Sequence, residues 1–276
     1  MSEPNPASWK NDLDGVATPA DIGVQSYPTL QWLSGNAALR GTWRARGHFF
    51  ISADQSVECN WGETDFVTKS GEVIHGYAKD EMVCSIIRMR RAWFCEGKDG
   101  RFHRFAWNDY DSAKAFGKAS GKMQIIISAG GIDRPVALTL RGNLSKHAVE
   151  RNGWGDKARR FLYDPVAREY AAGKSKVEYK RLPSLCFWIS IGSPSEPFYL
   201  TVGEGNATSQ ITPIELIDPA DIVKPENMGN HIVSRTMRTM HEDIYSEASE
   251  WSKAWDKSFE APADTSRYDG PETDIG

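Results

Sequence analysis

The chain has 276 residues, 40% of them hydrophobic and 11% aromatic, which is enough apolar material for a packed core. No apolar run approaches the about 20 residues that a membrane span needs. The polar, acidic first residues lack the pattern of a secretory signal. Because the four cysteines show no C-x-x-C spacing, we expect reduced thiols and a cytoplasmic protein.

The formal net charge of −4 hides a strong asymmetry along the chain. Between Arg88 and Arg181 there are 21 Lys and Arg against 10 Asp and Glu, a balance of +11. From Thr201 to Gly276 there are 6 basic and 15 acidic residues, a balance of −9. This pattern predicts a surface that binds a polyanion, together with a separate acidic region.

The first segments predict an arm followed by strands. Residues 1–24 contain Pro4, Pro6 and Pro19 without periodicity, which predicts a flexible arm. The segment 43–51 alternates between apolar and basic side chains and predicts a strand. Its basic face consists of Arg44, Arg46 and His48.

Two neighbouring strands combine arginines with aromatic side chains. The segments 82–95 and 101–107 both alternate and are separated by a glycine-bearing turn, so they predict a hairpin. The side chains that share one face are Arg88, Arg90 and Phe94 on the first strand, and Arg101, His103, Phe105 and Trp107 on the second.

The segment from Lys122 to Arg141 predicts a second hairpin. Met123, Ile125 and Ile127 alternate onto one face, and 136–140 repeats the pattern after a turn at 129–133. The opposite face is polar and partly basic, and consists of Lys122, Gln124, Thr139 and Arg141. We therefore expect one wall of a half-exposed antiparallel sheet.

Helical patterns dominate the rest of the chain. The segment 146–170 predicts a helical insertion, whose cluster Lys157, Arg159 and Arg160 is either a second phosphate contact or a solvated helix face. Residues 219–260 predict one long amphipathic helix. Its apolar stripe predicts self-association, or else packing along the same chain. Residues 261–276 are acidic with little apolar content, and predict a disordered tail.

The basic and aromatic strand faces carry the functional prediction. Single-stranded nucleic acid is held by a positive groove along its phosphates and by aromatic rings on which its bases stack. The alternative is that the rings belong to the core and the arginines to a solvated face. The predicted nucleic-acid-binding residues are Arg44, Arg46, His48, Arg88, Arg90, Phe94, Arg101, His103, Phe105, Trp107, Lys122, Arg141, Lys157, Arg159 and Arg160.

No segment has the pattern of an active site. Asp109 and Asp111 could hold a divalent metal, but an isolated Asp-x-Asp is usually a turn. His241-Glu242-Asp243 lacks the second histidine of a zinc-protease helix, so a solvated face is expected. We therefore predict a protein that is not an enzyme and has no cofactor and no metal.

The strands between Trp43 and Arg141, followed by an acidic end, resemble single-stranded-DNA-binding proteins of bacteria and phages. This resemblance implies an OB-like barrel and an acidic tail that docks partner proteins. The family ends in an aspartate-rich run closed by Ile-Pro-Phe, whereas this chain ends in Asp274-Ile275-Gly276.

The prediction for the whole chain is thus a mainly β, α+β fold. An antiparallel OB-like barrel spans residues 25–218, and the long helix and the tail follow it. The predicted function is non-catalytic binding of single-stranded nucleic acid, with DNA as the expected ligand, although the sequence does not distinguish DNA from RNA. The alternative is an assembly subunit that forms homo-oligomers through the C-terminal helix, and a metal-dependent nuclease using Asp109 and Asp111 ranks third.

Overall fold

The computed structural model describes residues 27–35, 46–67, 71–97, 102–172, 182–194, 199–202, 209–217, 227 and 229–257. The predicted arm (residues 1–24) and tail (residues 261–276) lie outside these residues.

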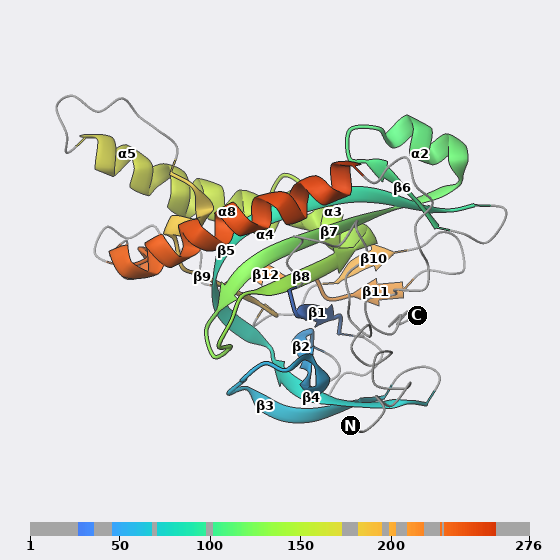
Figure 1. The fold of residues 1–276 in the computed structure, drawn as a ribbon, viewed down its shortest axis with the longest axis horizontal. Helices are drawn as coiled ribbons and strands as arrows, with labels where there is room; N and C mark the ends of the chain where they lie inside the picture. The colour runs from blue at the N-terminus through green and yellow to red at the C-terminus, as the bar shows by residue number, and fades with distance from the viewer. Residues whose placement is uncertain are drawn as a thin grey trace, which may run out of the picture.

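A mixed sheet of ten strands forms the centre of the described chain (Figure 1). Nine strands follow the order β12-β9-β5-β7-β8-β1-β2-β4-β3, and β6 pairs with the second half of β5. The strands are β1 (Thr29–Leu33), β2 (His48–Ser52), β3 (Gly62–Val67), β4 (Val73–Lys79), β5 (Glu81–Glu96), β6 (Phe102–Ala106), β7 (Lys118–Ala129), β8 (Val136–Arg141), β9 (Ile189–Gly192) and β12 (Glu215–Leu216). A separate pair joins β10 (Leu200–Val202) to β11 (Ser209–Ile211).

The predicted OB-like antiparallel barrel is wrong. A barrel closes when its first and last strands pair, but this sheet ends at β12 on one side and β3 on the other. The physical reason lies in β1, which pairs in parallel with β8 and antiparallel with β2. This pairing leads the sheet on to β2, β4 and β3 instead of back to β9. The molecule is therefore a mixed α+β protein with an open sheet.

The hairpin predicted around Lys122 and Arg141 is confirmed. β7 and β8 pair antiparallel, with Ile125 opposite Leu138 and Gln124 opposite Thr139. The connecting turn contains Gly131 at a φ of 90°, a conformation that side chains with a Cβ rarely adopt. The indole Nε1 of Trp61 donates to the carbonyl of Gly130 at 3.0 Å and fixes the turn.

One face of the sheet, here called the α3 face, builds the larger core. Leu30, Phe49, Ile125 and Leu138 are fully buried there, together with Trp154 from the helical segment. The helices of this segment are α3 (Gly142–Val149), α4 (Trp154–Ala158) and α5 (Asp164–Ala172), with a π-helical turn at Arg159–Tyr163 between α4 and α5. The remaining short elements are α2 (Tyr110–Phe116) and 3-10 turns at Ala53–Gln55, Ser184–Cys186 and Gly229–His231.

The opposite face, here called the α8 face, is covered by helix α8 (Arg235–Lys257), which lies across β5 in Figure 1. Ile244, Ala248 and Trp251 of this helix form a smaller core with Ile126 and Ala137 of the sheet. Although α8 has 23 residues, no helix in the described part of the chain is both long and apolar enough to cross a membrane.

The prediction of one long helix over residues 219–260 placed the start of the helix too early. Ile232 forms a β-bridge with Phe187, and the amide of Val233 donates to the carbonyl of Cys186 at 2.9 Å, so both residues are extended. Ser234 then accepts a hydrogen bond from the amide of Met237 at 3.4 Å, as an N-cap does. Helix α8 therefore begins at Arg235.

Candidate nucleic-acid interface

Two of the predicted contact residues, Arg88 and Arg90, lie beneath α8. The guanidinium of Arg88 lies 4.7 Å from the ring centroid of Tyr245, and that of Arg90 lies 3.5 Å from the ring centroid of Trp251. Arg90 also donates to the carbonyl of Trp251 at 2.7 Å and twice to the side-chain oxygen of Gln124, at 2.9 and 2.6 Å. These contacts fasten the helix to the sheet, so the geometry gives both arginines a structural role.

A β-bulge places Arg88 on this face. Ile86 pairs with Ile127 and Arg88 pairs with Ile126, so Ile87 is the extra residue of β5. Beyond the bulge, Arg90 stands opposite Gln124 and Phe94 stands opposite Ser120. The predicted sharing of one face by Arg88, Arg90 and Phe94 is thereby confirmed.

The α8 face continues past α8 as a basic and aromatic surface. Because directly paired residues of an antiparallel sheet point to the same side, the pairings assign each side chain to this face. Phe94 is paired with Arg104 of β6, and Lys122 is paired with Arg141 of β8. The surface, here called the basic tip, consists of Phe94, Arg104, Lys118, Lys122 and Arg141.

The side chains of the basic tip combine a ring with cations. The ammonium of Lys122 lies 5.3 Å from the ring centroid of Phe94, and both side chains are half-buried. Lys118 and Arg141 are exposed. The single carboxylate of this surface among the described residues is Glu96, which stands opposite Lys118. The basic tip therefore has an excess of positive charge.

Helix α8 ends before it has run the full length of this surface. The helix runs along β5 in the same direction as the strand, since Tyr245 meets Arg88 and Trp251 meets Arg90. From Trp251 to Lys257 the helix advances about 9 Å, whereas from Arg90 to Phe94 the strand advances about 13 Å. Figure 1 shows α8 ending on the side of the molecule where β6 and α2 lie.

The second predicted strand presents its basic and aromatic residues to the other side of the sheet. His103 is paired with Cys95, and Phe105 is paired with Trp93, both of which point to the α3 face. The structure therefore separates His103, Phe105 and Trp107 from Arg90 and Phe94. Arg104, which the sequence analysis did not select, replaces them on the α8 face.

The aromatic side chains on this side gather against α2. The rings of Trp93 and Trp107 are stacked, with centroids 4.5 Å apart and planes 4° apart, and Tyr110 lies 4.7 Å from Trp93. Phe116 lies 4.3 Å from the His103 ring and 5.5 Å from the Phe105 ring. We call this group the ring cluster: Trp93, His103, Phe105, Trp107, Tyr110 and Phe116.

The first predicted strand contributes little to either surface. Arg46 forms an ion pair with Asp80 at 3.7 Å and donates to the carbonyl of Pro194 at 3.5 Å. His48 is half-buried and pairs with Leu33 at the start of β2. Arg44 and Arg101 lie outside the described residues.

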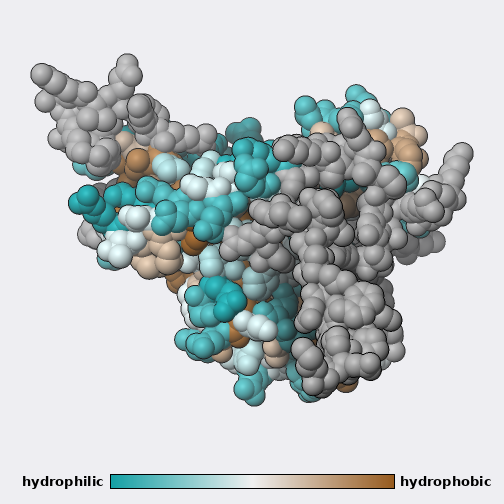
Figure 2. Space-filling model, viewed as in Figure 1, coloured by the Kyte–Doolittle hydropathy of each residue, from teal (hydrophilic) through white to brown (hydrophobic). Residues whose placement is uncertain are grey.

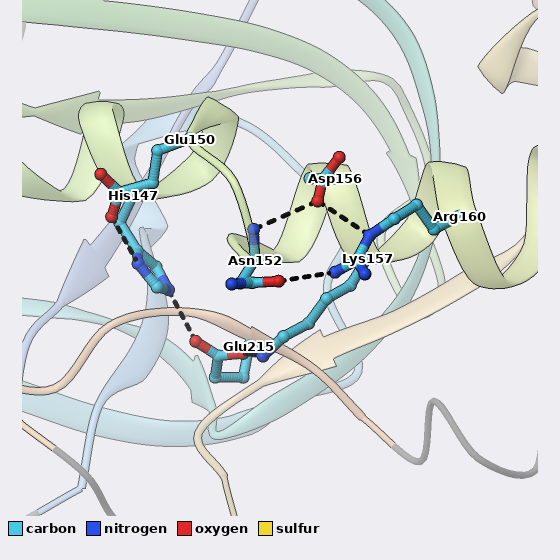
Figure 3. A network of polar contacts seen from close by, with 7 residues as sticks. All are labelled: His147, Glu150, Asn152, Asp156, Lys157, Arg160 and Glu215. Atoms are coloured by element: carbon cyan, nitrogen blue, oxygen red, sulfur yellow. Dashed lines mark hydrogen bonds and ion pairs between the residues drawn. The ribbon is translucent and has the colours of Figure 1, made fainter.

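The cluster Lys157, Arg159 and Arg160 is engaged with carboxylates. Arg159 contacts Asp156 at 2.6 Å and Asp164 at 3.3 Å, and Arg160 contacts Asp156 at 2.9 Å. Lys157 reaches the buried carboxylate of Glu215 at 2.5 Å (Figure 3). These ion pairs stabilise the helical segment. A phosphate would have to compete with the carboxylates of Asp156, Asp164 and Glu215 for the three cations.

Glu215 is a buried residue that the sequence analysis did not identify. Its second oxygen lies 2.6 Å from Nε2 of His147, whose Nδ1 lies 3.3 Å from Glu150 (Figure 3). Burial by itself raises the pKa of Glu215, but the hydrogen bonds from His147 and Lys157 outweigh it and hold the pKa below its ordinary value. Because His147 and Glu215 are 68 residues apart, no local pattern could have joined them.

The two weaker motifs carry no metal site. Asp109 and Asp111 are exposed at the start of α2, and the described residues contain no group of three or more His, Cys, Asp or Glu side chains able to hold a metal ion. His241 is fully buried and bonds through Nδ1 to the carbonyl of Leu185 at 3.1 Å, so the expectation of a solvated histidine is wrong.

Comparison with known proteins yields no match: no family model, no curated protein and no solved structure is similar to this chain. The resemblance to single-stranded-DNA-binding proteins therefore stays a prediction, apart from its implied barrel, which the fold contradicts.

Proposed function

We propose that the chain binds single-stranded nucleic acid, without catalysis, on the basic tip. The observation that carries this proposal is the grouping of Phe94 with Arg104, Lys118, Lys122 and Arg141 on one sheet face, where Lys118 and Arg141 are exposed. An open strand face offers rings for bases and cations for phosphates at the spacing of neighbouring strands. DNA is the proposed ligand and the cytoplasm the proposed compartment.

The distribution of charge supports the same proposal. The balance of +11 between Arg88 and Arg181 attracts a polyanion over long range, and the basic tip belongs entirely to that segment. Within the tip, cation contacts would set the affinity and its dependence on salt, while stacking on Phe94 would tolerate any base. This division between charge and stacking makes the proposal testable residue by residue.

The test is a titration of a fluorescent single-stranded oligonucleotide and the matching duplex, at several salt concentrations. We expect tighter binding of the single strand, with an affinity that falls steeply as salt rises. Lys118→Ala, Lys122→Ala and Arg141→Ala should each lower the slope of log K against log salt by about 0.7, the value for one phosphate contact on a single strand. Arg151→Ala removes an exposed arginine from the α3–α4 connection and should leave the slope unchanged. Absence of binding by the unmodified chain at low salt would refute the proposal.

The second candidate function is an assembly subunit that oligomerises through α8. Of the predicted apolar stripe, Val233, Ile244 and Trp251 are buried within the same chain, while Met240 remains 42% exposed. Figure 2 shows mostly hydrophilic side chains along the visible side of α8. A homo-oligomer would therefore have to use Met240 and its neighbours. Light scattering of the unmodified chain and of Met240→Glu compares the two functions, since a fall in mass caused by the variant favours the subunit.

A further inference from the structure

The ring cluster exposes two large aromatic side chains at the two ends of α2. Tyr110, the first residue of the helix, is 45% exposed, and Phe116, the last residue, is 40% exposed. Ala113 between them is fully buried and holds the helix against β5, where the thiol of Cys95 lies 3.1 Å from its carbonyl oxygen. The Cα atoms of these two residues lie about 9 Å apart along the helix axis. Figure 2 shows hydrophobic side chains gathered at this end of the molecule.

The rings cannot sink further into the sheet because each is already supported from below. Phe116 rests on His103 and Phe105 of β6, and Tyr110 rests on Trp93 of β5. Trp107, stacked on Trp93, lies against Gly121 of β7, where a Cβ would be 3.2 Å from its ring. Both exposed rings therefore rest on packed side chains, which reduces the conformational freedom that they would lose on stacking against a ligand.

The surroundings of the rings include cations. The guanidinium of Arg91 lies 4.9 Å from the ring centroid of Trp107. Lys114 is exposed one helical turn after Tyr110, on the same side of α2. Asp109 and Asp111 are the acidic neighbours, next to the positive N-terminal end of the short helix. A neutral apolar partner would leave Arg91 and Lys114 without any function in its recognition, whereas a polyanion uses both.

The ring cluster and the basic tip lie on opposite faces of β6. Among the described strands β6 pairs only with β5, so no described strand is hydrogen-bonded to its outer edge. Arg104 and Phe105 are consecutive on this strand and therefore point to opposite faces. A chain molecule that follows the basic tip to Arg104 can cross the edge of β6 and meet Phe105 and Phe116 on the other side.

We propose that the ring cluster is a second contact surface for the same single strand, which crosses the edge of β6 and stacks bases on Phe116 and Tyr110. This inference rests on the proposed function and extends it. The basic tip binds mainly phosphates, and the ring cluster binds bases. The two surfaces together select a flexible single strand, because a stiff duplex cannot fold around one β-strand.

The test measures affinity and salt dependence for the full chain with a single-stranded oligonucleotide. Tyr110→Ala and Phe116→Ala should each weaken binding about fivefold or more, since each removes a stacking partner. The slope of log K against log salt should stay unchanged in both variants, in contrast to the charge variants of the basic tip. Phe116→Leu keeps an apolar side chain but has no aromatic face, so its affinity should fall nearly as much as that of Phe116→Ala. Tyr245→Ala, which removes a 39% exposed ring from α8, is the matched control and should bind normally.

The outcomes separate this inference from the proposed function. If the unmodified chain binds and all three ring variants bind equally well, the inference is wrong and the proposed function stands. If the unmodified chain does not bind, the proposed function fails, and the inference fails with it. If the variants weaken binding by lowering the salt slope, the rings only support the cations, and the inference is overturned. A ring variant that instead changes the mass in light scattering would identify the ring cluster as a protein interface, which also contradicts the inference.

Discussion

The contact of Arg90 with α8 leads to a prediction that separates a structural arginine from one that binds a ligand. Arg90→Ala removes three charged hydrogen bonds, to Gln124 and to the carbonyl of Trp251, as well as the cation–π contact with the Trp251 ring. Hydrogen bonds to charged groups contribute about 1.5–3 kcal/mol each, and a cation–π contact about 0.5–2 kcal/mol. Because the half-buried site readmits water and these terms are not additive, we expect a loss of about 3 kcal/mol in the free energy of unfolding.

The assay is urea denaturation followed by circular dichroism, with a thermal scan as a second measurement. A loss of about 3 kcal/mol corresponds to a fall in Tm of about 6–10 °C for a chain of this size. Arg90→Lys keeps the charge but cannot donate in the same fork, so it should recover less than half of the loss. Arg141→Ala, which removes an exposed arginine, should change stability by less than about 0.5 kcal/mol. If Arg90→Ala is as stable as the unmodified chain but loses affinity for nucleic acid, Arg90 is a ligand contact and our assignment of it to the α8 interface is wrong.

Two further predictions concern close packing and acid stability. Gly121→Val places a side chain against the Trp107 ring, so it should lower the free energy of unfolding by about 1–3 kcal/mol and change the near-ultraviolet circular dichroism. Gly62→Ala is the control and should change neither, because its new Cβ meets nothing closer than 3.8 Å. Because folding lowers the pKa of Glu215, its ionised form stabilises the fold above its ordinary pKa, and this contribution is lost as the pH falls through the lowered value. In urea denaturations, Glu215→Gln should therefore lower the free energy of unfolding at neutral pH and reduce its fall below about pH 4.5. If the free energy of unfolding of the variant falls with acid as steeply as that of the unmodified chain, the assigned network is wrong.

The sequence predicted the strands of this region well because alternation is a local property. The segment 82–95 corresponds to β5 (Glu81–Glu96), and the hairpin predicted around Lys122 and Arg141 corresponds to β7 and β8. In each of these strands apolar side chains recur at every second residue over part of its length. Burial of one face fixes such a strand in the sheet. The sharing of a face by Arg90 and Phe94 followed directly from this pattern.

The covering of the α8 face could not be predicted in the same way. The apolar stripe of α8 is visible in the sequence, but it does not specify which surface the stripe packs against. In the structure the Trp251 ring lies against Arg90, whose guanidinium donates to the Trp251 carbonyl and to the side chain of Gln124, so α8 covers a partly polar patch of the sheet. The parallel pairing of β1 with β8 is equally remote in sequence, and it decides that the sheet stays open.

The division of the predicted interface into two faces has a single cause, the register of β6 against β5. Alternation within each strand was read correctly, yet it says nothing about which face of one strand meets which face of the next. The observed register pairs Glu96 with Phe102, so Phe94 meets Arg104, and His103 meets Cys95. A shift of one residue would have placed His103 beside Phe94 and built the single basic and aromatic face that the sequence suggested. The result of this register is a hairpin with cations and Phe94 on one side and the ring cluster on the other.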